Sequence, residues 1–247
     1  MAKKRTGPQR GTKNRRRGPR TLSLDIGGSG IKAMVLDRQG RSVSRRSRCP
    51  TPRPPVPKAV VNSIRKLIHP RLKFDRVSVG FPGVVVDGVV HTAVNLHPDW
   101  IGFDLARTLR LLLGKPVRAA NDADIQGYGV IEGSGVELVL TLGTGLGTAL
   151  FVNGHLVPNL ELGHHPFRKQ QTYEEQVGRA ALDAVGKRRW NRRVRQMLDL
   201  LGRIINYRMV YLGGGNAKKL EGPLPENARV VSNEAGLLGG ITLWRDK

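Results

Sequence analysis

The 247-residue sequence contains a single cysteine, Cys49, and few aromatic residues, which make up 5% of the chain. One cysteine excludes an internal disulfide framework and a zinc site built from several cysteines. The sequence also has no apolar run near the roughly 20 residues that cross a bilayer, and no apolar stretch follows its charged N-terminus. We therefore expect no membrane span and no secretory signal, with the cytoplasm as the default location.

Acidic residues are scarce relative to basic ones, because 19 Asp and Glu face 42 Lys and Arg, for a formal net charge of +23. Residues 1–20 carry nine of these positive charges and no acid, which leaves +14 for the rest of the chain. Such an excess predicts attraction to polyanions. The Gly- and Pro-rich composition of 1–20 predicts a disordered basic tail, either a solvated extension or an arm that binds polyanions non-specifically.

Glycine is abundant, and its placement suggests an internal repeat. Residues 21–36 and 137–153 both read as a strand, a glycine-rich turn and a second strand, which is the pattern of a β-hairpin. Helical spacing follows each of them further along the chain. Two related α/β halves that face each other across a cleft are the simplest interpretation.

The first glycine turn suits a bound anion. Glycines let backbone N–H groups converge on a phosphate without obstruction from a Cβ atom. The turn adds a hydroxyl and a cation, and its candidate donor-binding residues are Gly27, Gly28, Ser29, Gly30 and Lys32. Asp25, where the strand ends, is a candidate to hold Mg²⁺ through water. The alternative is a plain hairpin turn with an exposed lysine.

The second glycine turn strengthens the phosphate interpretation. It contains G-x-G-x-G but leads into a strand instead of a helix, which argues against a dinucleotide-binding fingerprint, and no P-loop lysine follows it. A hairpin turn that directs Thr144 into a cleft remains. Its candidate donor-binding residues are Gly143, Thr144, Gly145 and Gly147.

Polar residues after two further segments are candidates for chemistry on a hydroxyl. Asn121 and Asp122 end a buried strand, where a carboxylate can take a proton from an attacking hydroxyl, although both residue types also favour a helix N-cap. Asp124 is a candidate for that cap, which would leave Asp122 in the cleft. Glu161 and His164 lack the further ligands of a zinc site and suit a polyol better, or else a surface loop.

Seven motifs together resemble one known family. In order along the chain they are DIGGSGIK, GFPG, NLHPDW, NDAD, LTLGTGLGTAL, ELGHH and YLGGG. The sequence resembles the ROK family of sugar kinases and repressors, and within it the polyphosphate-using glucokinases. The resemblance runs from about Thr21 to the C-terminus and implies two actin-like, ribonuclease-H-like α/β domains with the active site in the cleft between them. We expect a domain of residues 21–123, joined by a C-terminal helix at about 233–247, and a second domain of 124–232.

The resemblance also implies roles for individual residues. Asp122 would be the general base that accepts the proton of the sugar 6-hydroxyl, and the two glycine turns would hold the phosphoryl donor. The implied sugar contacts are Gly83, Asn95, Asn121, Asp122, Glu161 and His164. A third glycine segment, Gly213, Gly214 and Gly215, would lie near an adenosine or the chain of a polymer. Members of the family are usually dimers, so a homodimer is expected.

Two departures from the family narrow the expected function. Residues 1–20 cannot form the helix-turn-helix of the ROK repressors, and the stretch after Glu161 lacks the cysteine-rich zinc motif of many ROK kinases, as the polyphosphate branch does. We therefore expect Mg²⁺ and no zinc. We also expect phosphoryl transfer to glucose from polyphosphate, with ATP as a second candidate donor. Alternatives are a strictly ATP-dependent glucokinase or mannokinase, and a nucleic-acid-binding protein on a kinase-like fold. The basic segment Lys187–Arg195 would be either a groove for polyphosphate or a solvated helical face.

Overall fold

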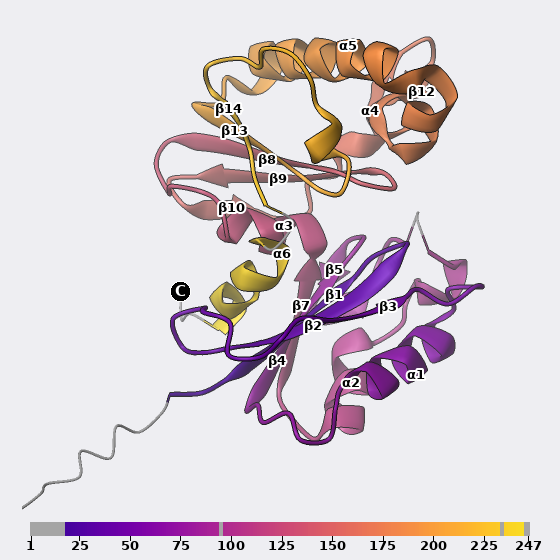
Figure 1. Ribbon diagram of the computed structural model, residues 1–247, viewed down its shortest axis with the longest axis vertical. Coiled ribbons are helices and arrows are strands. Elements are labelled where there is room, and N and C mark those ends of the chain that lie inside the picture. The colour runs from indigo at the N-terminus through magenta and orange to yellow at the C-terminus, as the bar shows by residue number, and fades with distance from the viewer. Residues whose placement is uncertain (1–17, 94–95, 233–234, 245–247) are drawn as a thin grey trace, which may run out of the picture.

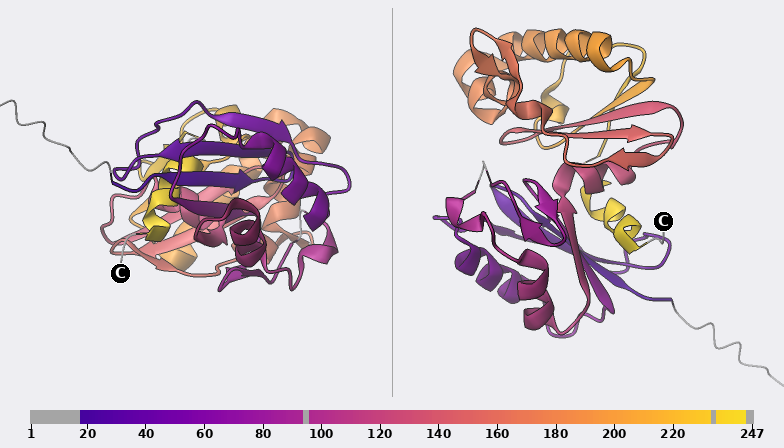
Figure 2. Two further views of the ribbon diagram at one scale, coloured as in Figure 1. Left: turned by 90° about the horizontal axis from the view of Figure 1, so that it is seen from below. Right: turned by 180° about the vertical axis from the view of Figure 1, so that it is seen from behind.

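The computed structural model describes residues 18–93, 96–232 and 235–244. Most of the predicted basic tail and the predicted sugar contact Asn95 lie outside the described residues. The longer strands form two five-stranded sheets, which lie one above the other in Figure 1 and, seen from behind, in Figure 2. Among the described residues, no helix is long and apolar enough to cross a membrane.

The first sheet has the strand order β3-β2-β1-β4-β7. Its first three strands form an antiparallel meander, whereas β4 and β7 run parallel to β1. Its strands are β1 (Thr21–Ile26), β2 (Gly30–Leu36), β3 (Ser47–Pro50), β4 (Arg76–Phe81) and β7 (Val117–Asn121).

The second sheet repeats this arrangement, with the order β10-β9-β8-β13-β14. Its first three strands are again an antiparallel meander, and β13 and β14 again run parallel to the first of them. Its strands are β8 (Val136–Leu142), β9 (Leu146–Val152), β10 (His155–Val157), β13 (Met209–Gly213) and β14 (Ala228–Val230). The two hairpins that the sequence predicts occupy equivalent places, because β1–β2 and β8–β9 are the first two strands, in chain order, of their sheets.

Helices and short strand pairs complete the structure. In the first half they are α1 (Pro57–Leu67), the pair β5 (Val85–Val86) and β6 (Val89–Val90), η1 (Pro98–Trp100) and α2 (Leu105–Leu113). Between the sheets lies α3 (Asp122–Tyr128), and at the end of the chain α6 (Ala235–Leu238) and η4 (Gly239–Trp244). In the second half they are η2 (Leu162–His164), β11 (Pro166–Arg168), β12 (Gln171–Thr172), α4 (Tyr173–Val177), α5 (Arg179–Ile205) and η3 (Ala217–Lys219).

Alternation along the central strands sends side chains to both faces of each sheet. In β1, Leu22, Leu24 and Ile26 pack into the core that α1 and α2 cover. In β8, Leu138, Leu140 and Leu142 pack beneath α5, whereas Val139 belongs to a separate cluster with Ala123 of α3. Both sheets are therefore covered on two faces, and α3 lies between them.

The end of the described chain returns to the first sheet. Ser23 Oγ donates to Leu237 O over 2.8 Å, and Ser78 Oγ donates to Gly240 O over 2.6 Å. The predicted terminal helix is thus a short α6 followed by the 3-10 turn η4. Glycine permits this contact, because a Cβ atom on Gly240 would lie 2.5 Å from Ser23 Oγ.

The sequence predicts a mostly helical segment from Glu174 to Tyr211 and a strand that runs from about Tyr207 into the third glycine segment. The helical part consists of α4 and α5 and ends at Ile205, and the strand is β13. Gly186, with φ of 74°, interrupts the helical conformation of α5. β13 is buried and pairs in parallel with β8.

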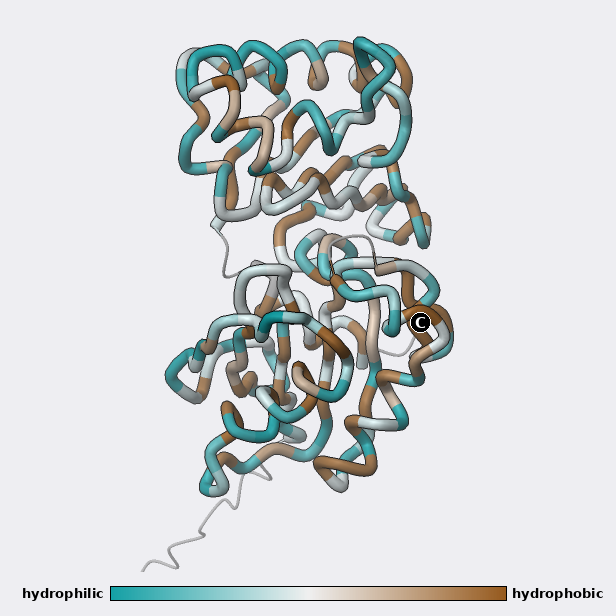
Figure 3. The backbone as a smooth tube through the Cα atoms, turned by 90° about the vertical axis from the view of Figure 1, so that its right-hand side faces the viewer, coloured by the Kyte–Doolittle hydropathy of each residue, from teal (hydrophilic) through white to brown (hydrophobic). Residues whose placement is uncertain are grey.

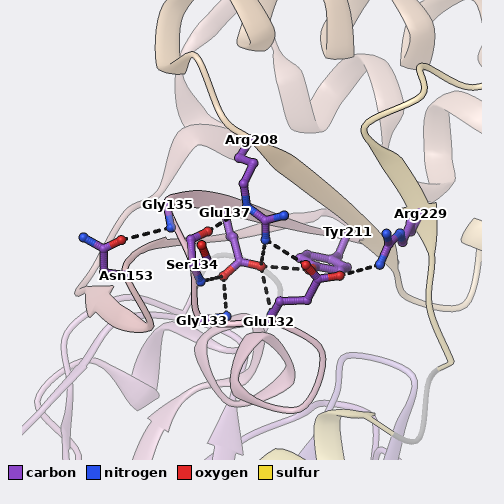
Figure 4. A network of polar contacts seen from close by, with 9 residues as sticks. All are labelled: Glu132, Gly133, Ser134, Gly135, Glu137, Asn153, Arg208, Tyr211 and Arg229. Atoms are coloured by element: carbon purple, nitrogen blue, oxygen red, sulfur yellow. Dashed lines mark hydrogen bonds and ion pairs between the residues drawn. The ribbon is translucent and has the colours of Figure 1, made fainter.

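A buried carboxylate fixes the loop that leads from α3 into the second sheet (Figure 4). Glu137 is fully buried in β8 and accepts hydrogen bonds from the backbone of Glu132, Gly133 and Ser134, and from the hydroxyl of Tyr211 at 2.8 Å. Arg208 lies 3.2 Å from the same carboxylate. Burial alone would raise the pKa of Glu137, but these donors hold it below its ordinary value.

Each sheet draws its strands from one part of the chain, which supports the predicted division at 123/124. We propose that boundary, which falls in the first turn of α3. The described part of the predicted C-terminal helix, residues 235–244, packs on the first sheet, as the proposed division requires.

Candidate active site

A cavity of about 580 Å³ opens between the two sheets. Its walls come from the turn between β1 and β2, the turn between β8 and β9, the start of α3, the region around η2, and η3. Parallel strands β4 and β7 end at this cavity, where the polar ends of strands in α/β sheets commonly bind ligands. The repeat therefore brings its two equivalent glycine turns to opposite sides of one space.

The two glycine turns have similar backbone closure. Gly27 N donates to Gly30 O over 3.0 Å, and Gly143 N donates to Gly145 O over 3.0 Å. Close packing excludes side chains beside them, since a Cβ atom on Gly147 would lie 2.3 Å from Thr141 Oγ1. Such turns leave further N–H groups for a phosphate.

The third glycine segment follows β13 and packs under the second turn. Gly214 has a φ of 84°, and a Cβ atom there would lie 2.4 Å from Leu142 O. A side chain is therefore excluded by both conformation and space. Gly214 and Gly215 line the cavity, whereas Gly213 does not. A Cβ atom on Gly213 would lie 1.9 Å from the side-chain amide nitrogen of Gln126.

Asp25 and Lys32 form an ion pair at the cavity, with Lys32 Nζ 2.6 Å from Asp25 Oδ2. They are cross-strand partners in the β1–β2 hairpin, which explains their contact. Among the described residues, no three His, Cys, Asp or Glu side chains come together as a metal site. The carboxylate of Asp25 would be enough for Mg²⁺. This ion commonly takes one or two protein carboxylates and completes its shell with water and substrate phosphates.

Asn121 begins α3 as its N-cap. Its Oδ1 accepts from Ala123 N over 2.7 Å and from Asp124 N over 3.4 Å. The prediction that Asp124 would be the cap is therefore wrong, because the cap is the last residue of β7. Asp124 is instead buried, and burial followed by the charge of Glu161 raises its pKa to about 7.

Asp122, the first residue of α3, lines the cavity next to this cap. Burial raises its pKa to about 8, with further contributions from the negative charges of Asp25, Glu161 and Asp124. A carboxyl group with a pKa near the working pH is suited to exchange a proton with a bound hydroxyl.

Polar side chains gather on the other side of Asp122. Asn121 Nδ2 donates to Glu161 Oε1 over 3.3 Å and to Gly83 O over 3.2 Å. His164 Nε2 lies 3.3 Å from Glu161 Oε2. A Cβ atom on Gly83 would lie 2.1 Å from Thr92 O, so only glycine fits against this loop. Amide, carboxylate and imidazole groups in one wall can hold several hydroxyls at once.

The structure thus brings together nearly all the predicted site residues. Those that line the cavity are Asp25, Gly27, Gly28, Ser29, Gly30, Lys32, Gly83, Asn121, Asp122, Gly143, Thr144, Gly145, Gly147, Glu161, His164, Gly214 and Gly215. Gly213 lies behind the wall, and Asn95 is outside the described residues.

Sequence reasoning missed four basic side chains that also line the cavity: Arg48, Arg179, Lys218 and Lys219. They come from β3, α5 and η3, and no motif connects such separate segments. Lys32, which the sequence also indicated, lines the cavity, but the basic run Lys187 to Arg195 is not part of it. A basic run is visible in a sequence, whereas the meeting of cations from three separate segments is not.

Comparison with known proteins shows the family. The family model described as "ROK family" matches residues 21–175. The chain belongs to the ROK family. The expected fold of two α/β halves is confirmed by ROK kinases of known structure.

The relatives of this ROK chain cover most of its length. It is 34% identical to the polyphosphate glucokinase of Mycobacterium tuberculosis (strain CDC 1551 / Oshkosh), over 88% of each chain. It is similar to the inorganic polyphosphate/ATP-glucomannokinase of Arthrobacter sp. strain KM, with a TM-score of 0.84, 30% identity, and coverage of 92% of this chain and 100% of that one. A ROK family glucokinase of Streptomyces griseus, solved with glucose and AMPPNP, has a TM-score of 0.75 at 21% identity over 91% of this chain and 98% of that one, which shows the fold alone.

Proposed function

We propose that this chain transfers the terminal phosphoryl group of inorganic polyphosphate to the 6-hydroxyl of glucose, with ATP as a second donor. The observation that carries the proposal is the position of Asp122 in one cavity, with the amide–carboxylate–imidazole wall on one side and the glycine turns on the other. The polyphosphate glucokinase and glucomannokinase relatives support the choice of donor and acceptor.

In the proposed reaction, glucose lies against Asn121, Glu161 and His164, and its 6-hydroxyl faces the carboxylate of Asp122. The hydroxyl oxygen forms a bond to the terminal phosphorus as the bond from that phosphorus to the bridging oxygen breaks. The hydroxyl proton passes to Asp122, and the shortened polyphosphate keeps the bridging oxygen and its electron pair. Such transfers depend chiefly on positioning and charge neutralisation.

The protein supplies neutralising charge from several elements. N–H groups of the two glycine turns face the donor, and Lys32, Lys218 and Lys219 contribute cations at the cavity wall. We propose that Asp25 binds Mg²⁺ through water; the ion would neutralise charge on the donor phosphates. The predicted absence of zinc stays a prediction.

A homodimer, a cytoplasmic location and non-specific polyanion binding by the basic tail belong to the same proposal. They rest on the family resemblance, on the single cysteine and on the charge of residues 1–20. Sedimentation of the full chain tests the dimer. Comparison of the full chain with a variant that lacks residues 1–17 tests the tail, since only retention on a polyanion, and not glucose phosphorylation, should be lost.

Parallel assays of glucose 6-phosphate formation test the function. Purified protein with Mg²⁺ is given glucose and either long-chain polyphosphate or ATP over a range of salt concentrations. We expect turnover with both donors, with a larger kcat/KM for polyphosphate that falls more steeply with salt, because more cations bind the polymer. Activity with ATP alone would refute the proposed donor, and mannose in place of glucose measures the selectivity for the acceptor.

A further inference from the structure

We propose that a second cavity, beside α5, continues the donor site and binds the part of the polyphosphate chain that extends beyond the catalytic cavity. This cavity of about 430 Å³ is lined by Arg188, Asn191, Arg195, Glu221, Gly222 and Pro223. The inference rests on the proposed function, because it concerns the same polymeric donor. It assigns to the basic segment Lys187–Arg195 of α5 a place on the path of the polymer, although this segment lies outside the catalytic cavity, which α5 reaches only through Arg179.

Three arginines of α5 form one stripe. Arg188, Arg192 and Arg195 follow the spacing i, i+4, i+7, which places them on a single face of a helix. Arg188 and Arg192 are exposed, and within the described residues neither has a carboxylate partner. The stripe ends at Asp199, which lies 3.1 Å from Arg203. The outer, upper part of the backbone in Figure 3, where α5 lies, is largely hydrophilic.

This stripe is connected to the catalytic cavity through η3 and the loop after it. Lys218 and Lys219 line the catalytic cavity, and Glu221, two residues later, lines the second. The buried amide of Asn191 fixes the loop to α5: its Nδ2 donates to Lys219 O over 3.1 Å, and its Oδ1 accepts from Glu221 N over 2.8 Å. The segment from Lys218 to Glu221, held by Asn191, therefore joins the wall of the catalytic cavity to the wall of the second cavity.

The charges are arranged so that the stripe remains open to an anion. The one carboxylate that lines the second cavity, Glu221, is paired with Lys187 on the flank of the helix. Arg195 is held by a 2.9 Å hydrogen bond from its Nη1 to the backbone oxygen of Glu221, which leaves its positive charge without a neutralising acid there. Like charges at i, i+4 cost a helix a few tenths of a kcal/mol, so Arg188 and Arg192 are better explained by a bound anion than by helix stability.

The chemistry of the second cavity favours polyphosphate over a nucleic acid. Proteins that bind single-stranded nucleic acids combine cations with aromatic side chains on which bases stack. Within the part of the chain that the structure describes, no aromatic residue lines this cavity. Trp190, the aromatic residue of this part of α5, is fully buried and donates to Val177 O. A flexible chain with about one negative charge per phosphate needs only the cations.

The test compares two variants that lose the same charge. Arg188→Ala/Arg192→Ala removes two exposed arginines from the stripe, and Arg65→Ala/Arg107→Ala removes two exposed helical arginines from the first half of the chain. Alanine favours helices, so both variants should fold. KM is measured for long-chain polyphosphate and for tripolyphosphate, and retention of labelled long-chain polyphosphate is measured without glucose, with RNA as a competitor.

For the stripe variant we expect KM for long-chain polyphosphate to rise about tenfold, KM for tripolyphosphate to rise less than about twofold, and the logarithmic salt slope to fall by roughly 1.4, since each lost phosphate contact is worth about 0.7. Arg188→Lys/Arg192→Lys should restore most of the affinity, and the control variant should behave as the parent.

Three outcomes would overturn the proposal: an equal KM rise for both donor lengths, an equal effect in the control variant, or loss of RNA retention with polyphosphate retention unchanged. If the parent makes no glucose 6-phosphate from polyphosphate, the proposed function fails. The retention assay still decides whether the stripe binds the polymer, so the two failures are distinguishable.

Discussion

Two acidic residues only fifteen positions apart in the chain, Asp122 and Glu137, have opposite environments. Glu137 is enclosed by backbone N–H groups, a tyrosine hydroxyl and an arginine, and its pKa lies below the ordinary value. Asp122 lies in a cavity near three other carboxylates, and burial together with their charges raises its pKa to about 8. Hydrogen-bond donors around a carboxylate stabilise its charged form and the fold. Burial among like charges raises the pKa of a carboxyl group instead, which suits it to proton transfer.

The largest expected effect concerns Asp122. Asp122→Asn should lower kcat by about 10²- to 10⁴-fold, because an amide cannot accept the hydroxyl proton, while the circular dichroism spectrum stays that of the parent. Steady-state assays with polyphosphate and ATP measure the loss. Nearly normal turnover by Asp122→Asn would show that Asp122, like Glu137, has no role as the base.

Glu137→Ala should have the reverse profile. We expect the free energy of unfolding to fall by about 3 kcal/mol, since several buried donors lose their acceptor, while kcat of the folded fraction changes little. Denaturant unfolding measures this cost. Glu226→Ala, at an exposed position of the same half, serves as the control and should cost less than about 0.5 kcal/mol.

The stability of the parent relative to Asp122→Asn should depend on pH. A carboxyl group whose pKa is raised in the folded state binds its proton more tightly there than in the unfolded chain. Its ionisation therefore costs stability progressively between pH 3.8 and about 8. Between pH 5 and pH 7 the variant should gain roughly 3 kcal/mol relative to the parent. Urea unfolding at each pH measures the two free energies of unfolding. A difference between parent and variant that does not change with pH would contradict the raised pKa.

The smallest expected effect is on the rate profile. Because kcat/KM reports groups of the free enzyme, its acidic limb should follow Asp122, with a pKa of about 8. We expect kcat/KM to fall about tenfold per pH unit well below that value. Glu137→Gln should leave this limb in place, since Glu137 contacts the loop after the end of α3, whereas Asp122 begins that helix. A shifted limb would show that the two carboxylates are coupled.

Much of the fold and the site follows from local patterns. The two glycine hairpins, the buried strand before Asn121 and the order of the seven motifs all depend on residues close in the chain, where strand alternation and turn chemistry act directly. They predict the repeat, the two glycine turns, and the amide, carboxylate and imidazole residues of the cavity wall. The family then supplies the fold, which its known structures confirm.

Other features depend on which segments meet. The sequence of NDAD permits either Asn121 or Asp124 to cap α3, and the choice was decided by the turn out of β7. The sequence indicates a strand around Tyr211, but only the structure shows that this strand pairs with β8. The pairing brings the hydroxyl of Tyr211 to Glu137, a contact between residues 74 positions apart.

The sequence by itself determined the glycine turns, the acidic residue at the start of α3 and the excess of positive charge. Only the tertiary structure decided that both turns face one cavity, that Lys218 and Lys219 complete it, and that Asn191 fixes the loop between this cavity and the arginine stripe. The physical reason is that turn and helix preferences act over a few residues, whereas pKa values and ligand sites depend on every charge within several ångströms, whatever its position in the chain.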